Sequence, residues 1–179
     1  MENILQPVLE NENVRLQPLQ QSDFEVLYNV ASDPEIWAQH PNKNRYEREV
    51  FQRFFEGAMA SDGAFLIIDK KSGETAGSTR FYSWDDDEST IFIGYTFYAK
   101  KFWGSGLNAQ VKKLMIDYIF EYVDLVKFHV GAENLRSRKA MEKLGAEFRG
   151  ETIVAYYGEP ERENVEYWIR KEQWRKNQQ

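Results

Sequence analysis

The sequence contains no cysteine and only two histidines among its 179 residues. A chain without cysteine has no disulfide framework, no thiolate metal site and no cysteine nucleophile. Basic residues are also in the minority, 23 against 29 acidic residues, and the formal net charge is −6 at pH 7. This balance argues against nonspecific binding of nucleic acid, which needs a basic surplus, and suits a cationic substrate such as an amine.

Long apolar runs are missing as well. No stretch approaches the length of a membrane span, and residues 1–6 lack the basic and apolar regions of a signal peptide. We therefore expect a cytoplasmic protein with no membrane partner. Hydrophobic residues still make up 42% of the chain, which is enough for a packed core at this length. No repeat or linker divides the sequence, so residues 1–179 are expected to form one domain.

The order of the predicted elements indicates a mixed sheet. Alternating or compact apolar patterns predict strands over residues 14–19, 64–69, 75–82, 90–98, 127–130, 148–157 and 164–170. Capping signals and helical spacing predict helices over residues 22–31, from 32 onward, and over 46–60, 106–122 and 135–144. The strands first follow one another and then alternate with helices. This order is typical of an α/β (α+β) single domain with a mixed sheet, not of a doubly wound one.

The clearest helical pattern, over residues 106–122, places apolar side chains at intervals of three and four. The expected buried face consists of Leu107, Val111, Leu114, Met115, Tyr118, Ile119 and Tyr122.

A glycine-rich turn precedes this helix and is the most informative segment of the chain. It reads Phe-Trp-Gly-Ser-Gly-Leu-Asn over residues 102–108. A turn of this kind gathers unpaired backbone amides at the positive end of a helix, which is a common place for phosphate. The turn therefore predicts a nucleotide-like cofactor held through its pyrophosphate, although a turn that merely connects a strand to a helix has the same composition.

A second segment, Asn134–Ser137, opens the next helix after one intervening strand. Asn134 is a good N-cap residue, and Ser137 alone could be a solvent-facing helical serine. The two segments together, in this order, carry more information than either one.

Together they resemble the GNAT superfamily of acetyl-CoA-dependent N-acetyltransferases, in particular its RimJ/RimL-like branch. The resemblance covers most of the chain. Besides the glycine turn, it includes Asp33–Trp37, Ile93–Tyr95 and the block Asn134–Ala146, which is specific to this branch.

The resemblance implies a fold and a cofactor site. The family has a mostly antiparallel sheet, flanked by helices, whose fourth and fifth strands (here 90–98 and 127–130) separate so that pantetheine lies between them. Its glycine turn is written Arg/Gln-x-x-Gly-x-Gly/Ala and binds the pyrophosphate of CoA; Trp103 takes the first position, Gly106 the middle glycine and Asn108 the final small residue. The implied acetyl-CoA contacts are Tyr95, Thr96, Phe97, Trp103, Gly104, Ser105, Gly106, Leu107, Asn108 and Asn134.

The implied reaction is direct attack of a primary amine on the acetyl thioester in a ternary complex, without a metal. The amine belongs to a small molecule or to a protein N-terminus. A backbone amide near Tyr95 to Phe97 polarises the thioester oxygen. Many relatives protonate the thiolate with a tyrosine where this chain has Met141, so the implied donor here is Ser137, oriented by Asn134, and these two residues form the expected catalytic pair.

The general base is left unassigned by the sequence. Relatives often carry a glutamate just ahead of Ile-Gly-Tyr, and this chain has Phe92 there. The acidic residues 85–88 fit a solvated hairpin tip. His40 could line the acceptor site, and His129 lies on a strand, where a structural or cofactor-flanking place is expected. The acceptor amine and the oligomeric state also stay open; a homodimer is compatible with the sequence.

Two other interpretations remain at this point. The spacing Gly104-x-Gly106-x-x-Ala109 fits a permissive dinucleotide fingerprint of an oxidoreductase, although a repeating βαβ unit is missing. A non-catalytic acetyl-CoA-binding or protein-interaction module on the same fold is the second alternative, because the strand glutamate and the helical tyrosine are absent.

Overall fold

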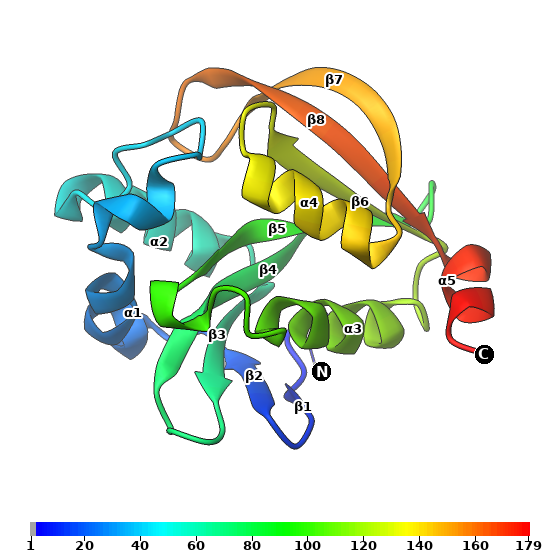
Figure 1. Cartoon of the computed structure of the whole chain (residues 1–179), viewed down its shortest axis with the longest axis horizontal. Coiled ribbons are helices and arrows are strands. Elements are labelled where there is room, and N and C mark those ends of the chain that lie inside the picture. Colours follow the sequence, from blue (N-terminus) through cyan, green and yellow to red (C-terminus); the bar gives the residue numbers. More distant parts are fainter. Residues whose placement is uncertain (1–2) are drawn as a thin grey trace.

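The computed structural model describes residues 3–179, which form one mixed sheet with helices on both faces (Figure 1). In chain order the elements are β1 (Leu9–Glu10), β2 (Val14–Pro18), η1 (Gln21–Asp23), α1 (Phe24–Ala31), η2 (Pro34–Trp37), α2 (Arg48–Ala60), β3 (Ala64–Asp69), β4 (Thr75–Asp85), β5 (Thr90–Tyr98), η3 (Lys100–Phe102), α3 (Leu107–Ile119), β6 (Leu125–Gly131), α4 (Leu135–Leu144), β7 (Glu147–Ala155), β8 (Glu161–Arg170) and α5 (Lys171–Asn177). None of the helices in this described part is both long enough and apolar enough to cross a membrane.

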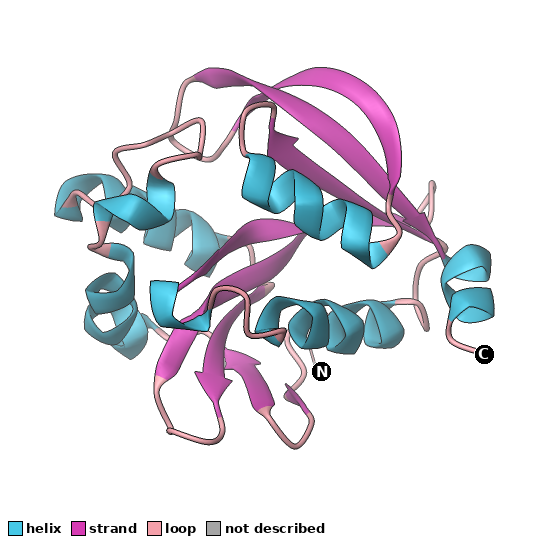
Figure 2. Cartoon of the chain, viewed as in Figure 1, coloured by secondary structure: helices cyan, strands magenta, loops and turns pink. Residues whose placement is uncertain are grey.

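The eight strands follow the order β1-β2-β3-β4-β5-β6-β8-β7. Every neighbouring pair is antiparallel except β5 and β6, which are parallel. The predicted mixed, mostly antiparallel sheet is therefore confirmed. Figure 2 shows strands β1–β5 diverging from strands β6–β8.

The sheet separates two hydrophobic cores because side chains alternate between its faces. On β3, Phe65 and Ile67 pack in the core that contains α3 and α4. Their neighbour Leu66 points the other way, into the core built by α1 and α2. Helix α2 reaches this second core through a stripe at helical spacing, Phe51, Phe54, Phe55 and Ala58.

Two elements and one helix end are the main differences from the sequence-based prediction. The short strand β1 and the C-terminal helix α5 were not predicted, since two and seven residues carry little periodic signal. Helix α3 ends at Ile119 and not near residue 122, so Tyr122 leaves the expected buried face and is 43% exposed. The chain turns there to bury Phe120 and Val123 before β6 begins.

Candidate active site

Strands β5 and β6 pair only at their beginnings and then separate. Pairing joins Thr90–Phe92 to Leu125–Lys127. Beyond these residues, the backbone groups that face each other across the gap form no hydrogen bonds with one another. Backbone N–H and C=O groups need partners, so the gap between the strands is suited to an extended ligand with amide groups.

A cleft of about 680 Å³ occupies this gap. Its walls come from β5 and β6, from the glycine turn with the first turn of α3, from α4, and from the segment around η2. All predicted site residues except Ser105 and Leu107 line it.

On β5 a β-bulge lies at the point where the strands separate. Tyr95 and Thr96 together lie opposite the single residue Thr79 of β4. Tyr95 adopts the left-handed conformation, with φ of 54°, which is costly for a residue other than glycine. Several contacts hold its side chain. The Arg80 guanidinium lies 3.7 Å from the centroid of its ring, and its hydroxyl accepts a hydrogen bond from the backbone N–H of Tyr157 (3.1 Å).

The glycine turn leaves only part of its amides available. The N–H groups of Trp103 and Ser105 donate to backbone carbonyls of η3, and that of Leu107 donates to the Ser105 hydroxyl at 3.3 Å. No partner within residues 3–179 takes the N–H groups of Gly104, Gly106, Asn108 and Ala109. Gly104 and Gly106 both have positive φ, 71° and 84°, so four free amides gather at the N-terminus of α3 and make a site for an anion.

Beneath the turn lies a buried polar network that the sequence analysis missed. The Lys112 ammonium donates to Thr96 Oγ1 (3.1 Å) and to Asn108 Oδ1 (3.3 Å), and the Tyr98 hydroxyl also donates to Asn108 Oδ1 (2.8 Å). The side chain of Asn108 is therefore held by these two donors. Lys112 is only 3% exposed, and burial lowers the pKa of its ammonium to about 7.

Trp103 and Arg136 connect the turn to α4. The Arg136 guanidinium lies 3.7 Å from the Trp103 ring centroid, and the Trp103 indole donates to the backbone carbonyl of Tyr98 (3.1 Å). The backbone N–H of Arg136 donates to the Gln39 side chain (3.1 Å). These contacts join three walls of the cleft.

The comparison with known proteins agrees with this geometry. Residues 13–147 match the acetyltransferase (GNAT) domain. The chain belongs to the GNAT acetyltransferase family. Membership identifies it as an N-acetyltransferase and confirms the resemblance stated from the sequence. It also overturns the oxidoreductase interpretation, as does the sheet, which has one parallel pair and no doubly wound order.

Solved structures of acetyltransferases share the fold. A GCN5-related N-acetyltransferase from Brucella melitensis is 22% identical, with a TM-score of 0.82 over 95% of this chain and 81% of that one. A GNAT-family acetyltransferase from Bacillus anthracis is 20% identical, with a TM-score of 0.75 over 93% and 99%. RimJ from Mycobacterium smegmatis, in complex with CoA-disulfide, is 17% identical, with a TM-score of 0.71 over 93% and 87%.

In this acetyltransferase, the predicted pair Asn134 and Ser137 meets at the start of α4. Asn134 is the N-cap, and its Oδ1 accepts the backbone N–H of Ser137 at 3.3 Å. The contact therefore reaches the backbone of Ser137 and not its hydroxyl. Both residues line the cleft, with Asn134 7% exposed and Ser137 half-buried.

The candidate general bases fall into two groups by their distance from the cleft. Residues 85–88 lie at a hairpin tip away from the cleft. His40 and His129 both line it. The ring of His40 is engaged at both nitrogens, Nδ1 with the backbone of Asn42 and Nε2 with Nη1 of Arg45 (3.2 Å). Burial and the adjacent Arg45 charge hold the pKa of His40 well below its usual range.

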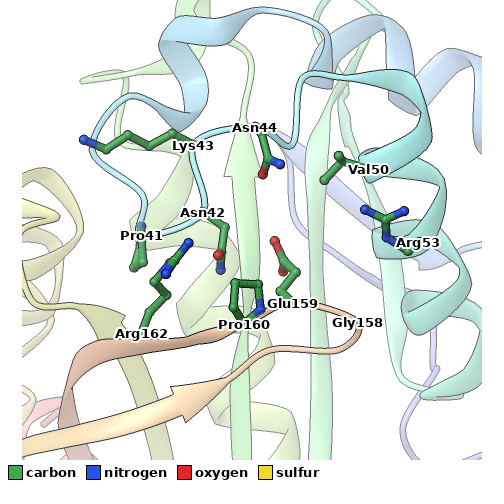
Figure 3. Close-up of a pocket in the computed structure, with 10 residues that line it drawn as sticks. All are labelled: Pro41, Asn42, Lys43, Asn44, Val50, Arg53, Gly158, Glu159, Pro160 and Arg162. Atoms are coloured by element: carbon green, nitrogen blue, oxygen red, sulfur yellow. The ribbon is translucent and has the colours of Figure 1, made fainter.

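Arg45 closes the end of the cleft near η2. It is 1% exposed and pairs with Glu159 through three contacts of 2.5 to 3.1 Å. Its guanidinium also lies 4.9 Å from the ring centroid of Phe54 and 5.3 Å from that of Tyr156. Beyond the pair lies a second cavity of about 310 Å³, lined by residues 41–44, α2 and the β7–β8 hairpin (Figure 3).

Proposed function

We propose that this protein transfers the acetyl group of acetyl-CoA to a primary amine, on a protein N-terminus or a small molecule, by direct attack within a ternary complex. One observation carries the proposal: the separated strands, the bulge at Tyr95 and the free amides of the glycine turn all border a single cleft. The substrates need to meet in one place for direct transfer, and this cleft offers it.

The residues of the cleft fit acetyl-CoA part by part. The free N–H groups at Gly104, Gly106, Asn108 and Ala109 form the pyrophosphate site. Pantetheine lies between β5 and β6, where its amides pair with the backbone near Tyr95, Thr96 and Phe97. Only the backbone of Phe97 is available, because its side chain is 4% exposed and packs in the α1–α2 core.

The protein contributes to the reaction in three ways. The bulge at Tyr95 directs a backbone N–H toward the thioester oxygen, whose charge grows during attack. Held together, amine and thioester react without the entropy loss of an encounter. The CoA thiolate needs a proton or a hydrogen bond as the C–S bond breaks, and the Ser137 hydroxyl at the start of α4 is assigned to this role.

Two measurements test the proposal. Calorimetric titration with acetyl-CoA, with NAD as the control, is expected to give micromolar binding of acetyl-CoA alone. Release of free CoA thiol is then followed with a panel of primary amines and N-terminal peptides. Absence of acetyl-CoA binding contradicts the cofactor site. Binding without turnover on any amine supports the non-catalytic module instead.

A further inference from the structure

His129 lies where β5 and β6 begin to separate, two residues past the last paired position of β6, Lys127. Its imidazole packs against the ring of Phe92, with 4.5 Å between the ring centroids, and it lines the cleft.

A carboxylate on the neighbouring strand holds this histidine. His129 on β6 lies directly opposite Glu166 on β8, and its Nε2 is 2.8 Å from Glu166 Oε1. The indole of Trp168 donates to the other oxygen, Oε2, at 2.7 Å. With both oxygens engaged, the carboxylate has a fixed orientation. The side chains of His129 and Glu166 are 16% and 25% exposed.

The hydrogen bond to Glu166 selects the tautomer of the ring. An ionised carboxylate only accepts, so Nε2 of a neutral His129 carries the proton and Nδ1 keeps its lone pair. In the described part of the chain, no residue forms a hydrogen bond with Nδ1. His40, by contrast, has contacts at both ring nitrogens.

The charged and titratable neighbours allow this ring to gain a proton. Among residues 3–179, Glu166 is the carboxylate that lies within ion-pair distance of the ring, and its negative charge attracts an imidazolium. Lys127 opposes the charge from two residues away, its ammonium lying 5.8 Å from the Phe92 ring centroid and 5.3 Å from that of Trp168. The guanidinium of Arg149 lies 4.2 Å from the Trp168 ring centroid. Tyr82 stacks on Phe92, and burial raises the pKa of its phenol, which stays neutral.

We infer that His129, held by Glu166, accepts the proton that the acceptor amine loses during acetyl transfer. The inference rests on the proposed function. As the N–C bond forms, the N–H proton passes to Nδ1, directly or through one water. The C–S bond breaks with its electron pair on sulfur, and the thiolate takes a proton from the Ser137 hydroxyl, which regains one from solvent. The imidazolium paired with Glu166 returns its proton to solvent before the next turnover.

The decisive variants are His129→Gln and Glu166→Gln, with Glu163→Gln as the matched control. Glu163 is an exposed residue of the same strand. For His129→Gln, kcat/KM is expected to fall about 100-fold or more, whereas the Kd of acetyl-CoA stays within twofold. For Glu166→Gln, kcat/KM is expected to fall by a similar factor, because the new amide donates to Nε2 and leaves the proton on Nδ1. Glu163→Gln should keep wild-type kinetics.

The pH profile separates a proton acceptor from a merely structural residue. A proton acceptor works only in its deprotonated form, so wild-type kcat/KM should fall as the pH is lowered and show an acid limb. That limb is expected to disappear in His129→Gln, while the limb due to the acceptor amine remains. In His129→Ala, added imidazole should restore part of the rate.

The outcomes distinguish this inference from the function on which it rests. If the wild-type protein binds acetyl-CoA and acetylates no amine, the proposed transfer fails and the role of His129 fails with it. If the wild type is active and His129→Gln keeps its rate and its acid limb, only the role of His129 is overturned. Retained acetyl-CoA binding in each variant shows that the fold is intact.

Discussion

At the scale of single residues, position 106 is the one that most clearly requires glycine. Its φ of 84° lies in the left-handed region, and a Cβ built there would meet nothing within 4 Å. A side chain at this position therefore costs backbone strain of about 1–2 kcal/mol and also fills the space in front of the free amides.

We expect Gly106→Val to abolish acetyl-CoA binding while the protein stays folded, because the side chain would cover the anion site. Gly73→Val is the matched control: Gly73 has a φ of 75° and equally open surroundings, but it lies in the β3–β4 turn. Calorimetry and circular dichroism measure the two effects. If Gly106→Val binds acetyl-CoA with unchanged affinity, the glycine turn does not hold the pyrophosphate.

Ser137 is expected to act on the rate and not on affinity. Ser137→Ala should lower kcat by about 10- to 100-fold, since the thiolate would lose its proton donor. The Kd of acetyl-CoA should stay unchanged. Ser137→Thr restores a hydroxyl and should recover part of the rate. If Ser137→Ala keeps the wild-type kcat, this serine is not the proton donor and has only a structural role.

Lys112 makes stability depend on pH. Its folded pKa of about 7 lies below its ordinary value of 10.5, so between these values the unfolded chain binds more protons. The free energy of unfolding therefore rises with pH across this range, by up to about 1.4 kcal/mol per pH unit.

Lys112→Met should remove this dependence. The variant is expected to be more stable than wild type at pH 7, and the gain should shrink toward pH 10. Thr96 and Asn108 keep their other partners, Thr79 and Tyr98. Urea unfolding at several pH values measures the difference, with the exposed Lys113→Met as control. A gain that does not change with pH would contradict the lowered pKa of the buried Lys112.

At the scale of elements, one buried ion pair ties the β7–β8 hairpin to the chain before α2. Arg45 and Glu159 are 114 residues apart in sequence, and their side chains are 2% and 8% exposed. Removing one member of such a pair leaves a buried charge without compensation.

Glu159→Gln is therefore expected to lower the free energy of unfolding by about 3–5 kcal/mol. The double change Arg45→Met with Glu159→Leu should recover part of this loss, because no unpaired charge remains. Glu161→Gln, an exposed neighbour on the same hairpin, serves as the control. Urea denaturation curves measure the free energy of unfolding of each variant. A loss below 1 kcal/mol in Glu159→Gln would show that water reaches Arg45.

At the scale of the whole molecule, the cleft lies between β5 and β6. There the strands β1–β5 diverge from the strands β6–β8 (Figure 2). A ligand bound there contacts both groups and binds the folded state alone. Acetyl-CoA at 100 times its Kd should add about 2.7 kcal/mol of stability.

For a chain of this length, that energy raises Tm by about 5–10 °C. Scanning calorimetry with and without acetyl-CoA measures the shift, and NAD is the negative control. An equal shift with both ligands would mean that the effect is nonspecific.

The order of elements and the family could be predicted from the sequence because their signals are local. Glycine at 104 and 106, the N-cap at Asn134 and the helical stripe from Leu107 to Ile119 each depend on neighbours within a few residues. The separation of β5 and β6 was expected only through the family resemblance, and the structure confirms it. The prediction for Tyr122 was wrong, because periodicity continues past the residue at which tertiary packing ends the helix.

The sequence by itself determined the mixed sheet, the single-domain pattern and the segments that border the cleft. Only the tertiary structure decided the burial of Lys112, the left-handed backbone of Tyr95 and the pairing of His129 with Glu166, 37 residues away. The physical reason is that burial and hydrogen-bond partners depend on strand register across the sheet. Residues distant in the chain are brought together there, and their charge and conformation follow from contacts that no local pattern records.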